Sequence, residues 1–155
     1  MTGINDRLEE LSIVLPPAPD PVASYVSAVC SGNLLMTSGQ IPTVSGQLVA
    51  TGPVPSACSE LEAKSAARQC MINALAVIRD SLDGDLDRIT RILRIRVYIA
   101  SDVGFTGQST VADGASDLLH ELLGDRGLHA RSAVGVSSLP LGASVELDVL
   151  TEVDG

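Results

Sequence analysis

Residues 130–153 read ARSAVGVSSLPLGASVELDVLTEV and predict the last two strands of the fold. In the first strand, from Arg131 to Ser138, small and β-branched residues alternate. In the second, from Ala143 to Val153, apolar residues alternate with acidic ones. A period of two is typical of a strand that buries one face. The short LPLG turn between the two strands predicts that they pair as a hairpin.

Upstream of this pair, the sequence alternates between strand and helix patterns. The expected elements are a helix at 5–11, an extended arm over 15–21, a hairpin of 24–32 and 34–40 around Gly32–Asn33, a short strand at 47–50, a helix at 59–82, a strand at 94–99 and a helix at 110–123. Both long helices connect segments of sheet. They should therefore cover one face of a mixed sheet, which is an α+β fold of two layers. We expect one domain over 1–155, in which 1–22 form the N-terminal helix and arm.

That arrangement leaves the second face of the sheet uncovered in an isolated chain. That second face must be buried somehow, and association with another copy of the same chain is the natural solution. The sequence therefore predicts an oligomer.

Composition and charge argue against several classes of function. The 155 residues have a net charge of −9 and only 2% aromatic residues, so binding to a nucleic acid is disfavoured by repulsion and by the lack of stacking rings. The three cysteines include no CxxC pair, which predicts reduced thiols in a cytoplasmic protein, with Cys30 and Cys70 in the core. The charged N-terminus is unlike a signal peptide, and no apolar run is long enough to predict a membrane span.

Arg131 begins a strand that is otherwise uncharged. Ala133 and Gly135 share its strand face and leave space beside it. A guanidinium group matches a carboxylate with two parallel hydrogen bonds. Arg131 is therefore a receptor for a carboxylate ligand, a surface arginine, or the partner of an acid in the same chain.

Glu146 poses a similar choice on the following strand. It is either a solvated acid on the polar face or, in a partly closed pocket, a general acid or base acting on water. In a hairpin that places Glu146 near Gly135, about four strand positions separate it from Arg131, on the order of 13 Å. This distance is too long for both residues to hold one small substrate within a subunit. If they cooperate, the sequence predicts a site shared across a subunit interface.

The sequence AVCSGNLLMTSGQIP at 28–42, followed by residues 130–153, resembles the RidA/YjgF family of reactive-intermediate imine and enamine deaminases, also called endoribonuclease L-PSP. The resemblance extends from about Ser24 to Val153 and includes the GN turn, SGQIP, and the R-x-x-V-x-V and V-E-L motifs in order. It implies a chorismate-mutase-like fold and a homotrimer with pockets between subunits. It also implies hydrolysis of 2-imino acids, such as 2-iminobutanoate and 2-iminopropanoate, to 2-keto acids and ammonia, without a metal or organic cofactor.

The resemblance also implies roles for individual residues. It implies a carboxylate-binding role for Arg131, a water-positioning or water-activating role for Glu146, and pocket-lining roles for Tyr25, Ser38, Gly39 (through its backbone) and Ala133 (through its backbone).

Departures from the family pattern leave alternatives open. Ala23-Ser24 stands where many members have Gly-Pro, and the segment before the second long helix contains no asparagine. The chain thus resembles a divergent branch, and a non-catalytic small-carboxylate-binding or regulatory protein on the same scaffold is the alternative. An endoribonuclease is less favoured, because the charge is negative and no histidine pair is evident. His129 is expected in a loop or interface rather than in the pocket.

Overall fold

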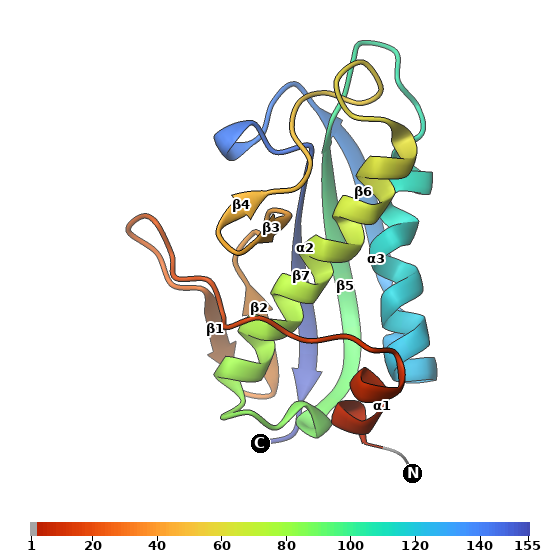
Figure 1. Ribbon diagram of the computed structural model, residues 1–155. Helices are drawn as coiled ribbons and strands as arrows, with labels where there is room; N and C mark the ends of the chain where they lie inside the picture. Colours follow the sequence, from red (N-terminus) through yellow and green to blue (C-terminus); the bar gives the residue numbers. More distant parts are fainter. Residues whose placement is uncertain (1–2) are drawn as a thin grey trace.

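The last strand of the chain lies at the centre of the sheet in the computed structural model, which describes residues 3–155 (Figure 1). β7 (Val145–Val153) pairs antiparallel with β2 (Leu34–Thr37) on one side and with β5 (Ile89–Ala100) on the other. β1 (Ala28–Ser31) forms one edge through its hairpin with β2, and β6 (Ala130–Val136) forms the other edge. The sheet order is therefore β1-β2-β7-β5-β6.

The predicted hairpin between the last two strands is wrong. β5 lies between β6 and β7, pairing in parallel with the first and antiparallel with the second. β5, the following helix and β6 form a crossover unit, in which the second strand returns parallel to the first. β7 then occupies the remaining edge of β5, and the turn at η3 (Pro140–Gly142) belongs to a connection between strands that are not neighbours.

Two helices cover one face of the sheet, as the sequence predicted. α2 (Glu60–Ser81) and α3 (Gln108–Leu123) lie side by side on that face (Figure 1). α2 begins with a capping box: the Ser59 hydroxyl accepts a hydrogen bond from the Glu62 amide, and the Glu62 carboxylate accepts one from the Ser59 amide.

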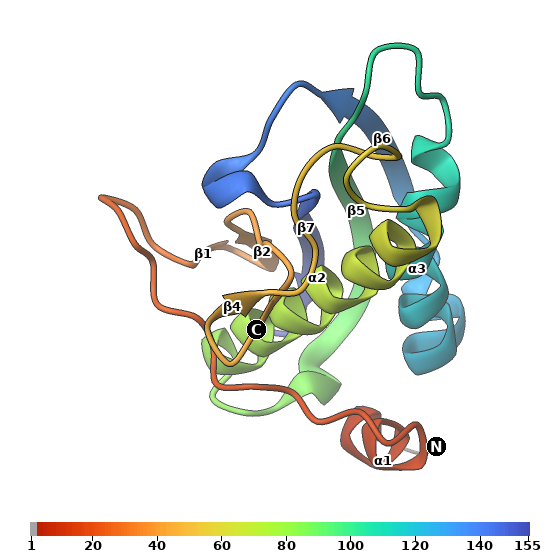
Figure 2. The same ribbon diagram turned by 45° about the horizontal axis from the view of Figure 1, so that its top comes forward.

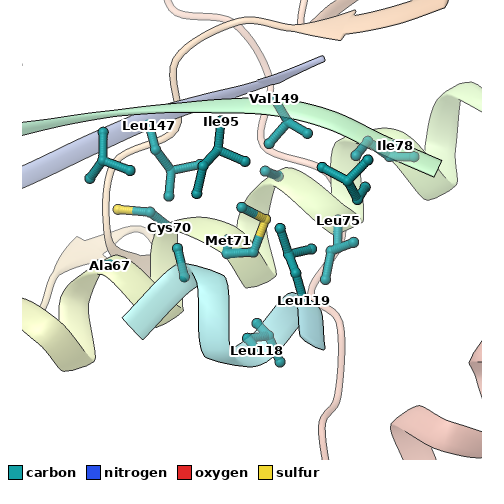
Figure 3. Close-up of a cluster of buried hydrophobic side chains, with 14 of the residues drawn as sticks. Ala67, Cys70, Met71, Leu75, Ile78, Ile95, Leu118, Leu119, Leu147 and Val149 are labelled. Carbon is teal, nitrogen blue, oxygen red and sulfur yellow. The ribbon is translucent and has the colours of Figure 1, made fainter. Parts of the chain in front are cut away.

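The core lies between this helical layer and the sheet (Figure 3). β7 contributes branched side chains at every second residue, and β5 does so from Ile95 to Ile99. At the start of β5, two register shifts space the buried isoleucines three residues apart. Both helices contribute apolar side chains from one face, many of them small. Small residues on α2 let it approach the sheet closely. The labelled core residues are Ala67, Cys70, Met71, Leu75, Ile78, Ile95, Leu118, Leu119, Leu147 and Val149.

The N-terminal segment packs across the outside of the helical layer. α1 (Ile4–Glu10) buries Ile4 and Leu8, and the Ile4 amide donates to the Asp87 carboxylate at 2.7 Å. The arm then crosses α2, where Arg79 donates to the Pro16 carbonyl at 2.8 Å (Figure 1). Before β1 the chain forms a loop that projects from the rest of the molecule in both views (Figures 1 and 2).

The remaining elements are short. β3 (Thr43–Val44) and β4 (Gln47–Leu48) form a separate two-stranded ribbon. The 3₁₀ helices η1 (Leu86–Arg88) and η2 (Gly124–Gly127) follow α2 and α3. No helix within residues 3–155 has the length and apolar character needed to cross a membrane.

The sheet face opposite the helices is open and partly apolar. Val29, Met36 and Leu150 align across β1, β2 and β7, and Val134 lies on β6. Val29, Met36 and Val134 are about half exposed. Cys30, expected in the core, is also exposed, because it lies on the edge strand β1; Cys70 is buried as predicted.

Candidate functional site

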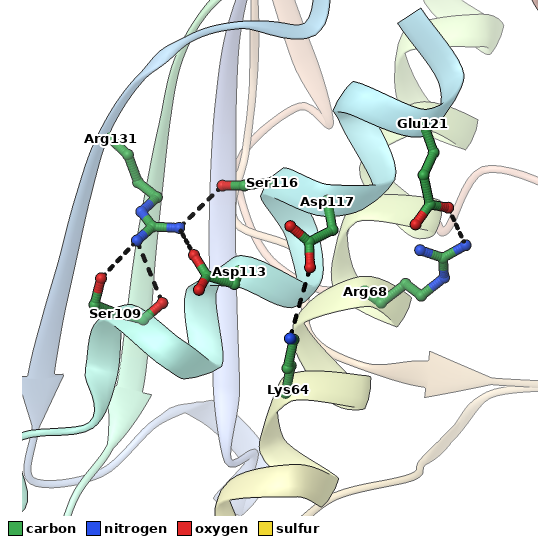
Figure 4. Close-up of polar contacts among 8 residues, drawn as sticks. All are labelled: Lys64, Arg68, Ser109, Asp113, Ser116, Asp117, Glu121 and Arg131. Carbon is green, nitrogen blue, oxygen red and sulfur yellow. Dashed lines mark hydrogen bonds and ion pairs between the residues drawn. The ribbon is translucent and has the colours of Figure 1, made fainter. Parts of the chain in front are cut away.

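Arg131 lies on the edge strand β6 and extends toward α3 (Figure 4). Its Nη1 donates to Asp113 Oδ1 at 2.8 Å and to Ser116 Oγ at 3.1 Å. Its Nη2 donates to Ser109 Oγ at 2.8 Å and to the Ser109 carbonyl at 3.3 Å. The structure therefore realises one of the alternatives open at the level of sequence, an arginine paired with an acid of its own chain.

The three partners of Arg131 form one stripe on α3. Ser109, Asp113 and Ser116 are spaced four and three residues apart, which places them on the same side of a helix. Ser116 is held in turn by His129, whose Nε2 lies 3.0 Å from Ser116 Oγ. We call these residues, with Arg131, the arginine cluster.

His129 lies in the loop between η2 and β6, where a loop position was expected, but its hydrogen bonds were not predicted from the sequence. Its Nδ1 hydrogen-bonds the Gly127 carbonyl. Because that oxygen can only accept, Nδ1 carries the proton, and in the neutral ring Nε2 accepts from the Ser116 hydroxyl. His129 therefore orients a partner of Arg131 and is only partly exposed.

Glu146 lies on β7 and contacts Gly39, the residue that follows Ser38 after β2. A methyl group at Gly39 would overlap the Glu146 carboxylate, so this close approach requires glycine. Among residues 3–155 no group hydrogen-bonds that carboxylate. Burial and the nearby Asp148 carboxylate raise the pKa of Glu146. A carboxyl group with a raised pKa and free oxygens suits proton transfer to and from water.

Gly39 also lines a cavity of about 250 Å³ between the arm and the sheet end. We call it the arm cavity. Its walls are largely apolar, with one acid, Asp20, on the arm. Glu146 is not among the residues that line it. The lining residues are Pro19, Asp20, Pro21, Val22, Tyr25, Ser27, Gly39, Gln40, Ile41, Thr43, Gly46 and Leu141.

The other predicted site residues fall into different places. Tyr25 lines the arm cavity and is about half exposed. The Ser38 hydroxyl donates to the Val26 carbonyl at 2.6 Å, which ties the end of β2 to the loop carrying Tyr25. Ala133 follows Arg131 on the same strand face and packs against the core. One chain therefore brings Tyr25, Ser38, Gly39 and Glu146 to one region and leaves Arg131 and Ala133 in another.

The register shows how far apart the two groups are. Arg131 pairs with Ile95 on β5 and shares its helix-covered face. Glu146 pairs with Tyr98 on the same strand and lies on the open face. Three strand positions along β5 and two inter-strand steps separate Arg131 from Glu146, roughly 14 Å between Cα atoms. The two side chains also leave opposite faces, so a small molecule cannot contact both within one chain.

Sequence reasoning missed Asp113 and its neighbours Ser109 and Ser116. Their spacing on α3 was a usable signal, because it places three polar side chains on one side of a helix that packs beside β6, where they need polar partners. Arg131 can be identified as the partner of this stripe only if α3 is known to pack beside β6, which follows from the crossover. The sequence analysis predicted a hairpin instead and so did not bring α3 and β6 together. Among residues 3–155, no three His, Cys, Asp or Glu side chains gather closely enough to hold a metal ion.

Comparisons with known proteins identify the family of the chain. Residues 16–153 match the family described as Endoribonuclease L-PSP. Protein TCP17 from Trypanosoma cruzi is 43% identical over 149 residues, which cover 96% of this chain and 92% of that protein. The 2-iminobutanoate/2-iminopropanoate deaminase of Dermatophagoides farinae is 27% identical, over 92% of this chain and 95% of the relative.

A solved structure extends the likeness to three dimensions. The protein Atu1372 from Agrobacterium tumefaciens, described as having unknown function, superposes with a TM-score of 0.91 at 44% identity. The alignment covers 97% of this chain and 92% of that one. The fold and the sequence thus define an L-PSP protein: the chain belongs to the RidA/YjgF family, as its motifs indicated.

Proposed function

We propose that this protein hydrolyses reactive 2-imino acids and their enamine tautomers to 2-keto acids and ammonia, in pockets shared between the subunits of a cytoplasmic homotrimer. The observation that carries the proposal is the state of Glu146: a partly buried carboxyl group with a raised pKa and no hydrogen bond within residues 3–155.

The distribution of the predicted site residues supports a pocket completed by a second subunit. Arg131 lies at one edge of the sheet, while Tyr25, Ser38 and Gly39 lie near the other. The partly apolar open face supplies a surface on which copies of the chain can associate. In a closed ring, the edge carrying Arg131 in one subunit meets the region of Glu146 in the next.

The chemistry requires few groups. A protonated imine has an electrophilic carbon, so water can attack it without a metal. Glu146 accepts a proton from that water as its oxygen bonds to carbon, giving a tetrahedral amino alcohol. The carboxyl group then gives this proton to nitrogen. As the carbon–nitrogen bond breaks, the carboxylate takes the proton of the new hydroxyl group, so that ammonia leaves and the ketone forms, and this last proton passes to ammonia or to solvent. Arg131 holds the substrate carboxylate and so fixes the reacting carbon near the water.

The similarity to a named deaminase at 27% identity supports this reaction class. The family description also carries the word endoribonuclease. The net charge of −9 weighs against that activity, since RNA would meet a repulsive field.

The test is imine hydrolysis measured with an amino-acid oxidase as the source of 2-imino acids and semicarbazide as the trap. We expect the wild-type protein to reduce the trapped product, and Arg131→Ala to lose at least about 100-fold in rate, a typical penalty for losing substrate positioning. Arg68→Ala is the matched control, because Arg68 also pairs with an acid of α3, Glu121 at 3.0 Å, away from the proposed site (Figure 4). No acceleration with any imine, or full activity in Arg131→Ala, would overturn the proposal. Binding of 2-keto acids without turnover would favour the non-catalytic alternative.

A further inference from the structure

The guanidinium group of Arg131 is already occupied. An arginine carries five N–H donors, and the two terminal nitrogens hold four of them. All four of these are accounted for by Asp113, Ser116 and Ser109, which leaves the Nε proton. The pair of donors that a carboxylate would grip in parallel is therefore not free. The Arg131 side chain is also only 21% exposed.

Asp113 is the charged member of this set. Its Oδ1 lies 2.8 Å from Nη1, where one oxygen of a bound carboxylate would lie. Unlike Arg131, the Asp113 side chain is 46% exposed, so it can rotate toward solvent without movement of α3. The two serines are neutral acceptors and orient the guanidinium without cancelling its charge.

We propose that Asp113 sets the affinity of the site for carboxylates: it is an internal carboxylate that occupies Arg131, and a substrate carboxylate binds by displacing it. This inference rests on the proposed function, since it takes Arg131 as the anchor of the substrate. Two consequences follow. The arginine is kept oriented before the substrate arrives, and the affinity for carboxylates is lower than an unpaired arginine would give.

The chain offers a matched control four residues further along α3. Asp117 pairs with Lys64 at 3.6 Å and does not contact Arg131 (Figure 4). Asp117→Asn removes the same charge from the same helix as Asp113→Asn. A difference between the two variants therefore reports the contact with Arg131 rather than a change in net charge. Asparagine at 113 retains an amide oxygen that can accept from Nη1, which preserves the geometry of the arginine cluster.

The test is isothermal titration calorimetry of 2-oxobutanoate, a stable 2-keto acid, into the wild type and both variants. We expect Asp113→Asn to bind at least about fivefold more tightly than the wild type, because a neutral hydrogen-bond partner is easier to displace from a cation than a charged one. Asp117→Asn should stay within about twofold, the size of a screened effect at an exposed pair. Adding Arg131→Ala to Asp113→Asn should remove the gain. Asp113→Ser serves as a second variant if Asp113→Asn unfolds.

Equal or weaker binding in Asp113→Asn, or no binding in any variant, would overturn the inference. Imine hydrolysis measured with the same proteins distinguishes a failure of this inference from a failure of the proposed function. In an active enzyme, Asp113→Asn should lower KM more than it changes kcat, whereas a merely structural role would change both or neither. Turnover in the wild type without any gain in Asp113→Asn refutes only the inference. Tighter, Arg131-dependent binding without turnover in any variant refutes only the deaminase.

Discussion

At the scale of single residues, Gly39 controls where Glu146 can be. The Cβ of an alanine at 39 would overlap the Glu146 carboxylate, which is the flexible end of its side chain. Gly39→Ala should therefore displace Glu146 and leave the fold intact. We expect kcat for imine hydrolysis to fall at least about tenfold, toward the value of Glu146→Gln, with little change in melting temperature.

The double variant decides whether this loss acts through Glu146. If Gly39→Ala works by moving the carboxylate, adding it to Glu146→Gln should reduce kcat no further. Independent, multiplying losses would mean that Gly39 contributes in another way, such as by shaping the arm cavity that it lines.

The raised pKa of Glu146 also predicts a gain in stability when the residue is replaced. Burial makes its charged form less favourable in the folded state than in the unfolded chain. At a pH below the ordinary carboxyl pKa, Glu146 is neutral in both the folded and the unfolded state, so its burial does not lower the free energy of unfolding. As the pH rises past the unfolded pKa and through the raised folded pKa, the unfolded chain releases its proton first, so the wild type loses stability.

Glu146→Gln should therefore melt above the wild type at pH 7 and at the same temperature near pH 3. Calorimetric melting over this pH range measures the difference. A wild type that is as stable as Glu146→Gln at pH 7 would show that burial of the Glu146 carboxylate does not destabilise the folded state.

At the scale of elements, the start of α2 is set locally by Ser59 and Glu62. Ser59→Ala removes the hydroxyl that satisfies the Glu62 amide, and we expect a loss of about 1 kcal/mol, or roughly 2–4 °C in melting temperature. Ser65→Ala is the control, because Ser65 is exposed in the interior of the same helix. Melting of Ser59→Ala at the temperature of this control would contradict the capping assignment.

Local signals of this kind account for much of what the sequence could predict. The capping box, the spacing of apolar residues in α2 and the turn at Gly32, which has φ of 59°, each depend on a few neighbouring residues. The position of β6 at the edge of the sheet and the crossover do not depend on neighbouring residues alone. Whether β6 pairs with β5 or β7 is decided by α3 packing on the sheet, and adjacency in sequence favoured the wrong partner. The contact between Arg131 and Asp113 depends on that pairing.

At the scale of the whole molecule, the open sheet face predicts assembly. Three copies of the 16.0 kDa chain give about 48 kDa, which light scattering after size exclusion can resolve from a monomer or dimer. Met36→Lys places a charge among exposed apolar residues of this face and should shift the protein toward smaller species. A wild-type monomer, or a trimer unaffected by Met36→Lys, would contradict the use of this face.

The most direct test of the central claim is complementation between two inactive variants, Arg131→Ala and Glu146→Gln, unfolded and refolded together in equal amounts. In randomly mixed trimers with shared pockets, half of the pockets receive an intact arginine and half an intact glutamate. About a quarter therefore receive both, and the mixture should recover about a quarter of the wild-type rate of imine hydrolysis. A mixture no more active than its two parents would show that Arg131 and Glu146 do not meet across an interface, and would contradict the shared deaminase site.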